Sequence, residues 1–452
     1  MQNQILWIMM LSSFLTPFTS SALTLSLPDI GQAYQATPNE LGWVIEIFLL
    51  TSIIFLLPMG KLADRLGKRR IFLWGMSLFT VSSLAVALAP GMGGLLFFRA
   101  VQGIGAAMIY ATSMSILTLV SPPDKRGRAI GWNVSMVYVG LAFGPVLGGL
   151  LNYYLGWRSI FCFITAVGLV TVLAIMRFLR QEWIEEKASG RDGLGALLYG
   201  LAMVLMMYGL SELLNQSYAW ICLAVGCVIF AGFLFHELQV TQAILPIRLL
   251  LENREFSLSN LTAMLNYSAT FAISFLLSIY LQSVLGLSSR EAGLMLLVQP
   301  VMMAALSPQT GKLSDHHSAA KLSSMGMGII AIGLLGFTLT VYLRSLWLLI
   351  PVLLIVGTGF AFFAAPNNNA IMSSVPKKYY GLASSMLSTV RLVGQVLSIA
   401  IVTLLLSIDW SWLEATDRVV RNIELSFLVF TVLCIIGIVP SLSRKKHPSE
   451  KN

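Results

Sequence analysis

The sequence predicts an all-α integral membrane protein: two pseudo-symmetric six-helix bundles plus two inserted central helices, fourteen transmembrane helices in all. Three observations predict this fold. First, 57% of the 452 residues are hydrophobic and 11% are charged, whereas about 25% of a soluble globular chain is charged. Second, the hydrophobic residues form runs near the ~20 residues with which a helix crosses a bilayer. Third, short motifs of the first half recur in the second half.

Each hydrophobic run is expected to be a helix, because a helix satisfies its own backbone hydrogen bonds inside hydrocarbon. Glu212 and His236 lie close to the ends of the seventh and eighth runs. The predicted spans are 5–27, 42–62, 71–89, 94–118, 129–151, 159–179, 193–213, 219–238, 257–282, 292–311, 322–342, 346–372, 381–407 and 423–442.

The chain is internally duplicated. Gly60–Asp64 reads GKLAD, and 251 residues later Gly311–Asp315 reads GKLSD. At the same offset, Thr37 and Glu40 match Ser288 and Glu291, and each pair has the spacing of a capping box at a helix start. Paired repeats with a substrate site between them are typical of secondary transporters. We therefore expect an N-terminal bundle at 1–180, a cytoplasmic linker with two inserted helices at 181–255, a C-terminal bundle at 256–442 and a tail at 443–452.

The net charge of +9 follows membrane topology. Loops on the Arg65 side, counted with the C-terminal tail, hold 22 of the 29 Lys and Arg residues, and the opposite loops hold five. Because cytoplasmic loops carry the excess of positive charge, this bias predicts a multi-pass protein of the cell membrane with both termini in the cytoplasm. The basic residues therefore do not indicate nucleic-acid binding, and the bilayer is the expected partner.

Three motifs resemble signatures of the major facilitator superfamily. Gly60–Arg70 is similar to the loop between its second and third helices, and Leu95-x-x-x-Arg99-x-x-Gln102-Gly103 is similar to its fourth-helix signature. The third motif resembles the antiporter signature of drug-exporting facilitators. With fourteen spans, the chain resembles the drug:proton antiporter branch with two extra central helices. The antiporter residues are Gly131, Gly140, Gly144, Pro145, Gly148 and Gly149.

The resemblance implies that the loop is a latch between conformations. A static basic loop would explain Lys68–Arg70 but not Asp64 or the glycines. Asp64 can pair with basic neighbours or lie at a helix N-terminus, such as that of the span starting at Gly381. The residues expected to form the gate are Gly60, Asp64, Arg65, Gly67, Arg69 and Asp315.

Proton coupling is assigned to Glu46, Arg99 and Arg391. The related branch usually carries an Asp in the first span, but Thr19 stands at that position here. Glu46 is the acid well inside a span, and an intramembrane acid in apolar surroundings is a candidate proton site. Glu46 could instead be a charge partner of Arg391. Arg99 could take part in coupling, as the resemblance implies, or be satisfied by backbone carbonyls.

Polar side chains on two spans could line a substrate cavity. The same pattern could instead consist of hydroxyls that bond back to their own helix. The Pro366–Asn369 segment could be a polar entrance or a helix end. The candidate cavity residues are Thr16, Thr19, Ser20, Asn266, Thr270, Gln282 and Gln395.

Taken together, the sequence predicts a proton-coupled exporter of amphipathic small molecules that works by alternating access. A transporter of one specific solute such as a vitamin, a lipid-precursor translocator and a non-transporting membrane sensor are the alternatives. No nucleotide-binding signature, metal-ligand cluster or nucleophile arrangement occurs, so we expect neither an enzyme nor a cofactor or metal. A proton gradient would supply the energy, and we expect a monomer.

Overall fold

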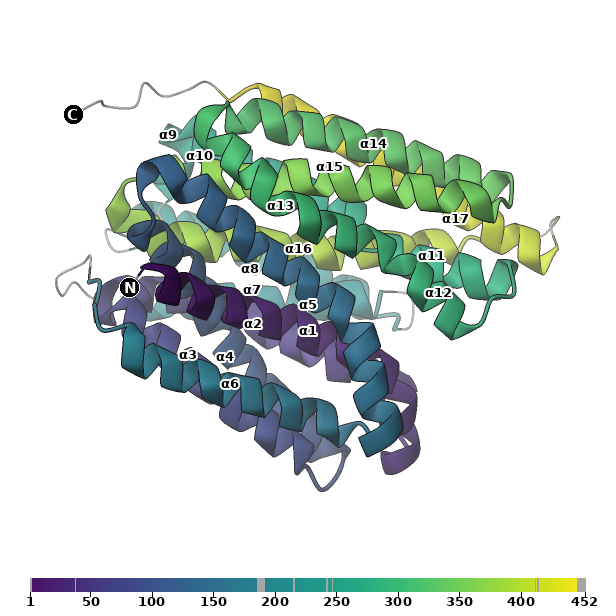
Figure 1. Cartoon of the computed structure of the whole chain (residues 1–452), viewed down its shortest axis with the longest axis horizontal. Coiled ribbons are helices and arrows are strands. Elements are labelled where there is room, and N and C mark those ends of the chain that lie inside the picture. The colour runs from purple at the N-terminus through teal and green to yellow at the C-terminus, as the bar shows by residue number, and fades with distance from the viewer. Residues whose placement is uncertain are drawn as a thin grey trace. The chain divides into compact units, whose positions relative to one another are not determined.

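The computed structural model describes residues 2–36, 38–184, 192–213, 216–240, 243–245, 247–410, 412 and 414–444. These residues form helices and no β-strand (Figure 1). Fourteen helices or helical segments in the described part are long and apolar enough to cross a membrane, which confirms the predicted spans. The capping box predicted at Ser288 and Glu291 is present, whereas its counterpart involves Thr37, which lies outside the described residues.

The chain divides into two compact units. The first contains 1–123, 136–252 and 375–389, and the second contains 124–135, 253–374 and 390–452. These units differ from the sequence halves at two places. The first ten residues of α5 (Arg126–Leu155) belong to the second unit, and the start of α16 (Tyr380–Leu406) belongs to the first unit.

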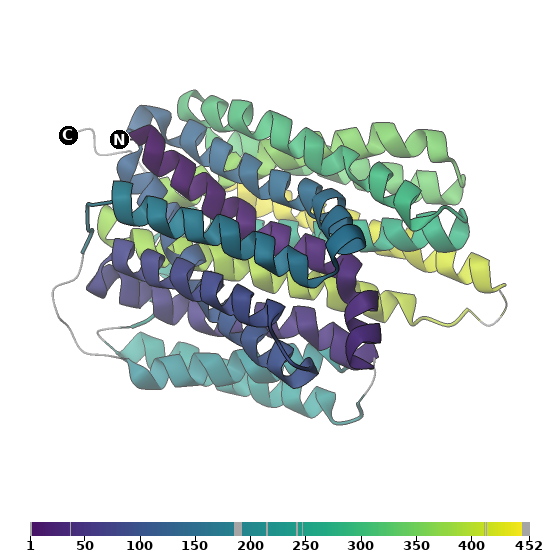
Figure 2. The same cartoon turned by 60° about the horizontal axis from the view of Figure 1, so that its bottom comes forward.

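The first unit is built from long antiparallel helices. Within it, α2 packs on α4, α3 packs on α4 and α6, and the inserted pair α7 and α8 lies side by side, with α7 against α2 (Figure 2). The helices that lie in this unit or enter it are α1 (Gln2–Tyr34), α2 (Pro38–Leu66), α3 (Lys68–Ala87), α4 (Met92–Val120), α5 (Arg126–Leu155), α6 (Arg158–Phe178), α7 (Gly193–Ser211), α8 (Ala219–Gln239) and α9 (Ile247–Glu252).

The second unit pairs α14 with α15 and α17, and α13 with α15. Its ninth span changes hydrogen-bond register, because α10 (Arg254–Thr270) is followed by α11 (Ile273–Ile279) and a π-helical turn, η2 (Tyr280–Val284). The remaining helices are α12 (Ser289–Leu296), α13 (Val298–His316), α14 (Ala319–Tyr342), α15 (Leu346–Ser373), α16 (Tyr380–Leu406) and α17 (Ala415–Leu442).

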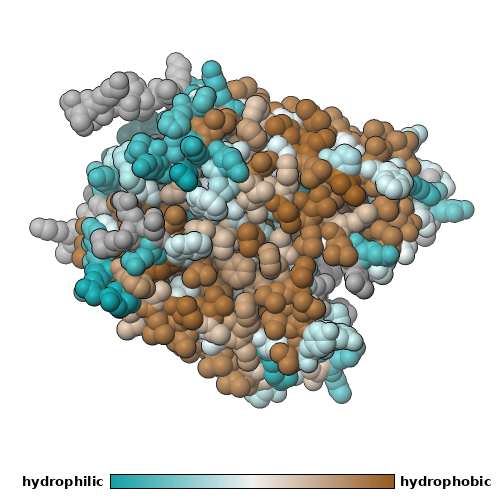
Figure 3. All heavy atoms as spheres, viewed as in Figure 1, coloured by the Kyte–Doolittle hydropathy of each residue, from teal (hydrophilic) through white to brown (hydrophobic). Residues whose placement is uncertain are grey.

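Apolar side chains cover the outer faces of both units. Large hydrophobic residues are exposed along α6, among them Leu169 and Leu173, and along α14, among them Ile332 and Leu335. Hydrophobic side chains cover much of the face in Figure 3, and hydrophilic side chains gather towards the helix ends. A surface of this kind suits lipid, because exposed apolar patches of this extent are rare on soluble monomers.

Candidate functional site

The predicted gating loop is held by a buried ion pair in the first unit. Asp64, at the end of α2, pairs with Lys68 at 2.8 Å, and both side chains are buried. The two residues are four apart, so they meet across the α2–α3 turn. The Asp64 carboxylate also packs on the first turn of α16, where a Cβ at Gly381 would overlap it. Asp64 thus combines both expected contacts, a basic neighbour and the start of α16.

A second carboxylate, Glu182, anchors the same loop. The backbone N–H of Arg69 donates to Glu182 Oε1 at 2.8 Å, and the Arg69 Nε–H donates to the Leu179 carbonyl. Gly67 has φ of +110°, and a Cβ there would overlap the Glu182 side chain, so this position requires glycine. The segment after α6 therefore caps α3, and Arg65 lies half-buried in the last turn of α2.

The repeat of this loop forms the corresponding contact in the second unit. Asp315, at the end of α13, accepts the Gly127 N–H at 2.5 Å and the Arg128 N–H at 3.0 Å. It therefore caps α5, which begins at Arg126. In the same way, a Cβ at Gly311 would overlap Gly127 and Gly131, and one at Gly60 would overlap Ser385. The duplication seen in sequence is thus also a duplicated helix contact.

The antiporter signature divides between two surfaces of α5. Gly140, Gly144 and Gly148 lie against α1, where Cβ atoms would overlap Phe14, Ser21 and Ala22 respectively. Gly131 instead lies against Ser307 and Pro308 of α13, in the second unit. Pro145 is half-buried inside the helix, and Gly149 lines a pocket near its end. The signature is therefore a device for close approach to two different helices.

Arg99 is fully buried at the first turns of α4. Its Nε–H donates to the Val44 carbonyl at 3.0 Å, its Nη1–H donates to Gln102 Oε1 at 2.6 Å, and its guanidinium lies 4.4 Å from the Phe48 ring centre. Gln102 in turn donates to Ser83 Oγ at 2.7 Å. Among the described residues, Arg99 Nη2 has no hydrogen-bond partner. The carbonyl contact expected as one alternative is present, and one nitrogen remains for a further acceptor.

Glu46 lies half-buried in α2, on the face opposite the one that meets Arg99. At 100° per residue, Val44 and Phe48 share the face towards α4, and Glu46 points about 180° from its centre. It shares the other face with Trp43, whose ring stacks on Tyr208 of α7 at 6.3 Å. Glu46 and Arg99 are therefore separated by α2. Arg391 is half-buried on α16 in the second unit.

Two of the first-span hydroxyls assigned to the cavity bond to their own helix. Thr19 Oγ1 donates to the Leu15 carbonyl at 2.7 Å, and Ser20 Oγ donates to the Thr16 carbonyl at 3.4 Å. Thr16 and Thr19 are buried, and Thr270 likewise donates to the Asn266 carbonyl at 2.6 Å. This is the alternative given above for a polar stripe.

The three amides assigned to the cavity in the second unit lie in different environments. Asn266 is fully buried, and neither atom of its amide has a hydrogen-bond partner among the described residues. Gln395 is half-buried beside Gly394, which packs on the α10 turn containing Asn266. Gln282 is exposed in the π-helical turn, bonded to Ser278 Oγ at 2.8 Å and roughly 24 Å along the span from Asn266 by helix rise.

The sequence profile of the Major Facilitator Superfamily matches residues 9–261 and 259–452. The chain belongs to this superfamily. The superfamily and the relatives that the chain matches are transporters, so this is a transport protein and not an enzyme.

Characterised facilitators similar to this chain differ in what they carry. The riboflavin transporter RibZ of Clostridioides difficile is 28% identical over 440 residues, covering 96% of each protein. The multidrug resistance protein Stp of Mycobacterium tuberculosis is 30% identical over 404 residues, covering 87% of this chain and 73% of Stp. The tetracenomycin C resistance and export protein of Streptomyces glaucescens is 28% identical over 401 residues, covering 86% and 73% respectively.

Solved facilitators share the fold. The human organic anion transporter MFSD10 has a TM-score of 0.69 at 15% identity, covering 97% of this chain and 99% of its own. The proton:xylose symporter XylE has a TM-score of 0.67 at 14% identity, covering 97% and 94%. At this identity the similarity establishes the arrangement of helices and not the substrate.

The asparagines after Pro366 are buried helix residues in this facilitator, because α15 continues to Ser373. Asn367 Nδ2 donates to the Ser259 carbonyl at 3.3 Å, and Asn369 Nδ2 donates to Ser314 Oγ at 3.0 Å. They join α15 to α10 and to α13, next to the capping residue Asp315. The feature of the sequence that could have predicted these buried contacts is the run of three consecutive amides inside a hydrophobic span.

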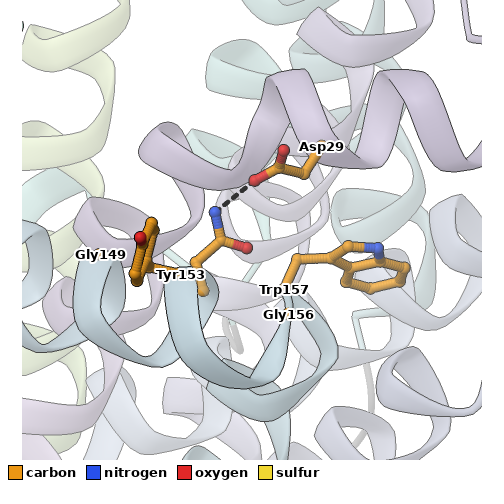
Figure 4. A pocket seen from close by; sticks show the side chains of 6 residues that line it. Asp29, Gly149, Tyr153, Gly156 and Trp157 are labelled. Carbon is orange, nitrogen blue, oxygen red and sulfur yellow. Dashed lines mark hydrogen bonds between the residues drawn. The ribbon is translucent and has the colours of Figure 1, made fainter.

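The acid that follows the first span lies at an open pocket of the facilitator's first unit. Asp29 accepts a hydrogen bond from Asn152 of α5, and the pocket of about 520 Å³ is also lined by Gly149, Tyr153 and Trp157 (Figure 4). The Asp29 side chain is exposed. It therefore ties α1 to α5 at a helix end and is not an interior acid comparable to Glu46.

Proposed function

We propose that this facilitator is a proton-coupled exporter of amphipathic small molecules, with both termini in the cytoplasm. The observation that carries the proposal is the contact between α5 and α1, where Gly140, Gly144 and Gly148 allow the helices to approach closely. This pattern resembles the signature of drug-exporting facilitators. Similarity to the tetracenomycin C resistance and export protein supports export as the direction of transport, and similarity to the multidrug resistance protein Stp supports a drug-like substrate.

In this proposal, Glu46 binds the proton. It is half-buried inside α2, where a carboxyl group close to apolar surroundings favours reversible protonation. The positive charges of Arg99 and Arg391 within the spans adjust how readily the proton is bound and released. Asp64 and Asp315 hold the starts of α16 and α5, so releasing either contact frees a helix end that must move during alternating access.

The test is transport in proteoliposomes under an imposed pH gradient. Glu46→Gln is expected to retain substrate binding and to lose at least ~90% of proton-driven export, because the amide cannot exchange a proton. Glu40→Gln, in the first turn of the same helix, is the matched control and should retain the wild-type pH profile. Export by Glu46→Gln with an unchanged pH profile would remove Glu46 from the mechanism.

Transport of one specific solute is the second candidate, because RibZ matches this chain over 96% of both proteins. Its name identifies riboflavin as the solute of that relative. Flux of riboflavin and of a panel of cationic dyes should be compared in the same proteoliposomes. Saturable riboflavin flux without dye flux would favour this candidate, whereas flux of several unrelated dyes favours the exporter.

A further inference from the structure

A cluster of titratable side chains closes one end of the inserted helix pair. Asp192 immediately precedes α7, and His236 and Glu237 lie in the last turn of α8. None of these residues belongs to the transport signatures. Asp192 and Glu237 are nevertheless buried, with side-chain exposure of 4% for Asp192 and residue exposure of 3% for Glu237. Two acids buried this deeply need compensating partners.

The cluster fastens three segments of the first unit together. Asp192 Oδ1 accepts the Gly195 N–H at 2.7 Å, which caps α7, and it lies 2.9 Å from His236 Nε2 on α8. Glu237 Oε2 accepts the Leu245 N–H at 2.8 Å. The side chains therefore connect the start of α7, the end of α8 and the segment that follows α8.

The two remaining carboxyl oxygens face each other. Asp192 Oδ2 and Glu237 Oε1 both lie within 3.0 Å of the point that a Cβ on Gly195 would occupy. The two oxygens therefore lie close together. Neither oxygen has a hydrogen-bond partner among the described residues. Two ionised carboxylates this close repel each other and have no donor between them, so one proton placed between the two oxygens would satisfy both.

The surroundings favour Glu237 as the proton carrier. Burial alone would raise the pKa of the Asp192 carboxyl. Hydrogen bonds from His236 and from the Gly195 N–H stabilise its negative charge more strongly, so the pKa of Asp192 lies below its usual range. Among the described residues, the donor to Glu237 Oε2 is the backbone N–H of Leu245. Because Asp192 has more donors to stabilise its charge, Asp192 stays ionised and Glu237 holds the proton.

The other helices that pack against α7 and α8 carry both basic and acidic side chains. On α2 the charged side chains near its end are Lys61, Asp64 and Arg65, and Asp64 is already paired with Lys68. On α9 they are Arg248 and Glu252. Within the cluster itself, the imidazole of His236 lies against the Asp192 carboxyl at 2.9 Å.

We propose that Asp192 and Glu237 bind one proton between them, so that the inserted helix pair carries a pH-sensitive clasp separate from Glu46. With the proton bound, the clasp holds α7, α8 and Ala243–Leu245 together. When the proton leaves at alkaline pH, two buried negative charges face each other and the clasp loosens. The clasp is a property of the inserted helices and does not depend on which substrate is carried.

The first experiment detects the proton directly. Infrared spectra of the purified full-length protein at neutral pH should contain a protonated-carboxyl band that is lost in Glu237→Gln and retained in Glu252→Gln, an exposed control on α9. Asp192→Asn provides a second variant. Its amide can donate to Glu237, which then ionises, so the band should be lost there too. A band unchanged in both cluster variants would overturn the proposal.

The second experiment measures what the proton does. Wild type and Glu252→Gln should lose thermal stability more steeply than Glu237→Gln as the pH is raised from neutral to alkaline. The amide introduced by Glu237→Gln keeps both contacts, because its N–H₂ donates to Asp192 and its carbonyl accepts the Leu245 N–H. Equal slopes for all three proteins would contradict the clasp. A wild type without the band, stabilised instead by Na⁺, would show a metal cation in place of the proton.

Discussion

Asp64 and Asp315 occupy equivalent places in the two repeats, yet they are stabilised differently. Asp64 is buried and paired with the buried ammonium of Lys68. Asp315 is half-buried and accepts two backbone N–H groups at the start of α5. At the 251-residue offset, the position of Lys68 is taken by Ala319. Duplication therefore preserved the helix contact, but the buried lysine that pairs with Asp64 has no counterpart in the second repeat.

This difference predicts that the two helix contacts, at Asp64 and at Asp315, differ in how easily they open. An ion pair removed from water is costly to break, because a buried charge is left without its partner. A cap made of backbone N–H groups can exchange with water at the helix end at lower cost. We therefore expect the contact at Asp315 to open more readily than the one at Asp64, and the following variants test that order.

The largest effect is expected for Lys68→Met. Removing the ammonium leaves the Asp64 carboxylate buried next to Gly381, at a cost of about 3–5 kcal/mol. Thermal unfolding in detergent measures this loss. Arg70→Gln is the control, since Arg70 is exposed and lies 3.9 Å from Glu182, so its loss should change stability little. The double variant Asp64→Asn with Lys68→Met should recover most of the loss. No recovery would mean that the pair is not the source of the cost.

An intermediate effect is expected for Gly127→Ala. The new methyl group would overlap the Gly311 carbonyl, the Ser314 hydroxyl and the Asp315 carboxylate, which pushes α5 away from α13. Overpacking of this kind costs about 1–3 kcal/mol. Gly293→Ala is the matched control, because no atom lies within 4 Å of its Cβ position and the helix gains from the alanine. Equal stability of the two variants would show that the α5–α13 contact is not close.

The sequence predicted the helices well, because hydrophobic run length directly reports the thickness that a span must cross. It also predicted that Asp64 and Asp315 are related, since the motif repeats. It could not select Lys68 from the basic run as the buried partner. That choice depends on how the turn after Leu66 orients α3, and Gly67 with φ of +110° sets this orientation.

The sequence also did not predict how each helix is rotated about its own axis, and therefore which face meets which neighbour. The sequence assigns both Glu46 and Arg99 to proton coupling. In the structure, Glu46 lies on the face of α2 opposite the face that Arg99 of α4 contacts. Likewise, one glycine signature serves α1 through Gly140 and α13 through Gly131. In a membrane span nearly all faces are apolar, so periodicity gives little information on which face meets which neighbour.

The smallest effect is expected for Asp315→Asn, and it decides the comparison. Asparagine keeps one acceptor oxygen, so one of the two N–H groups of Gly127 and Arg128 loses its partner, and the charge that favours a helix N-terminus is removed. The expected loss is about 1 kcal/mol. Asp64→Asn should cost clearly more, because it removes the negative charge that pairs with the buried Lys68 ammonium. Equal losses in thermal unfolding would show that the two repeats hold their carboxylates with the same strength, and that the missing lysine at Ala319 has no energetic consequence.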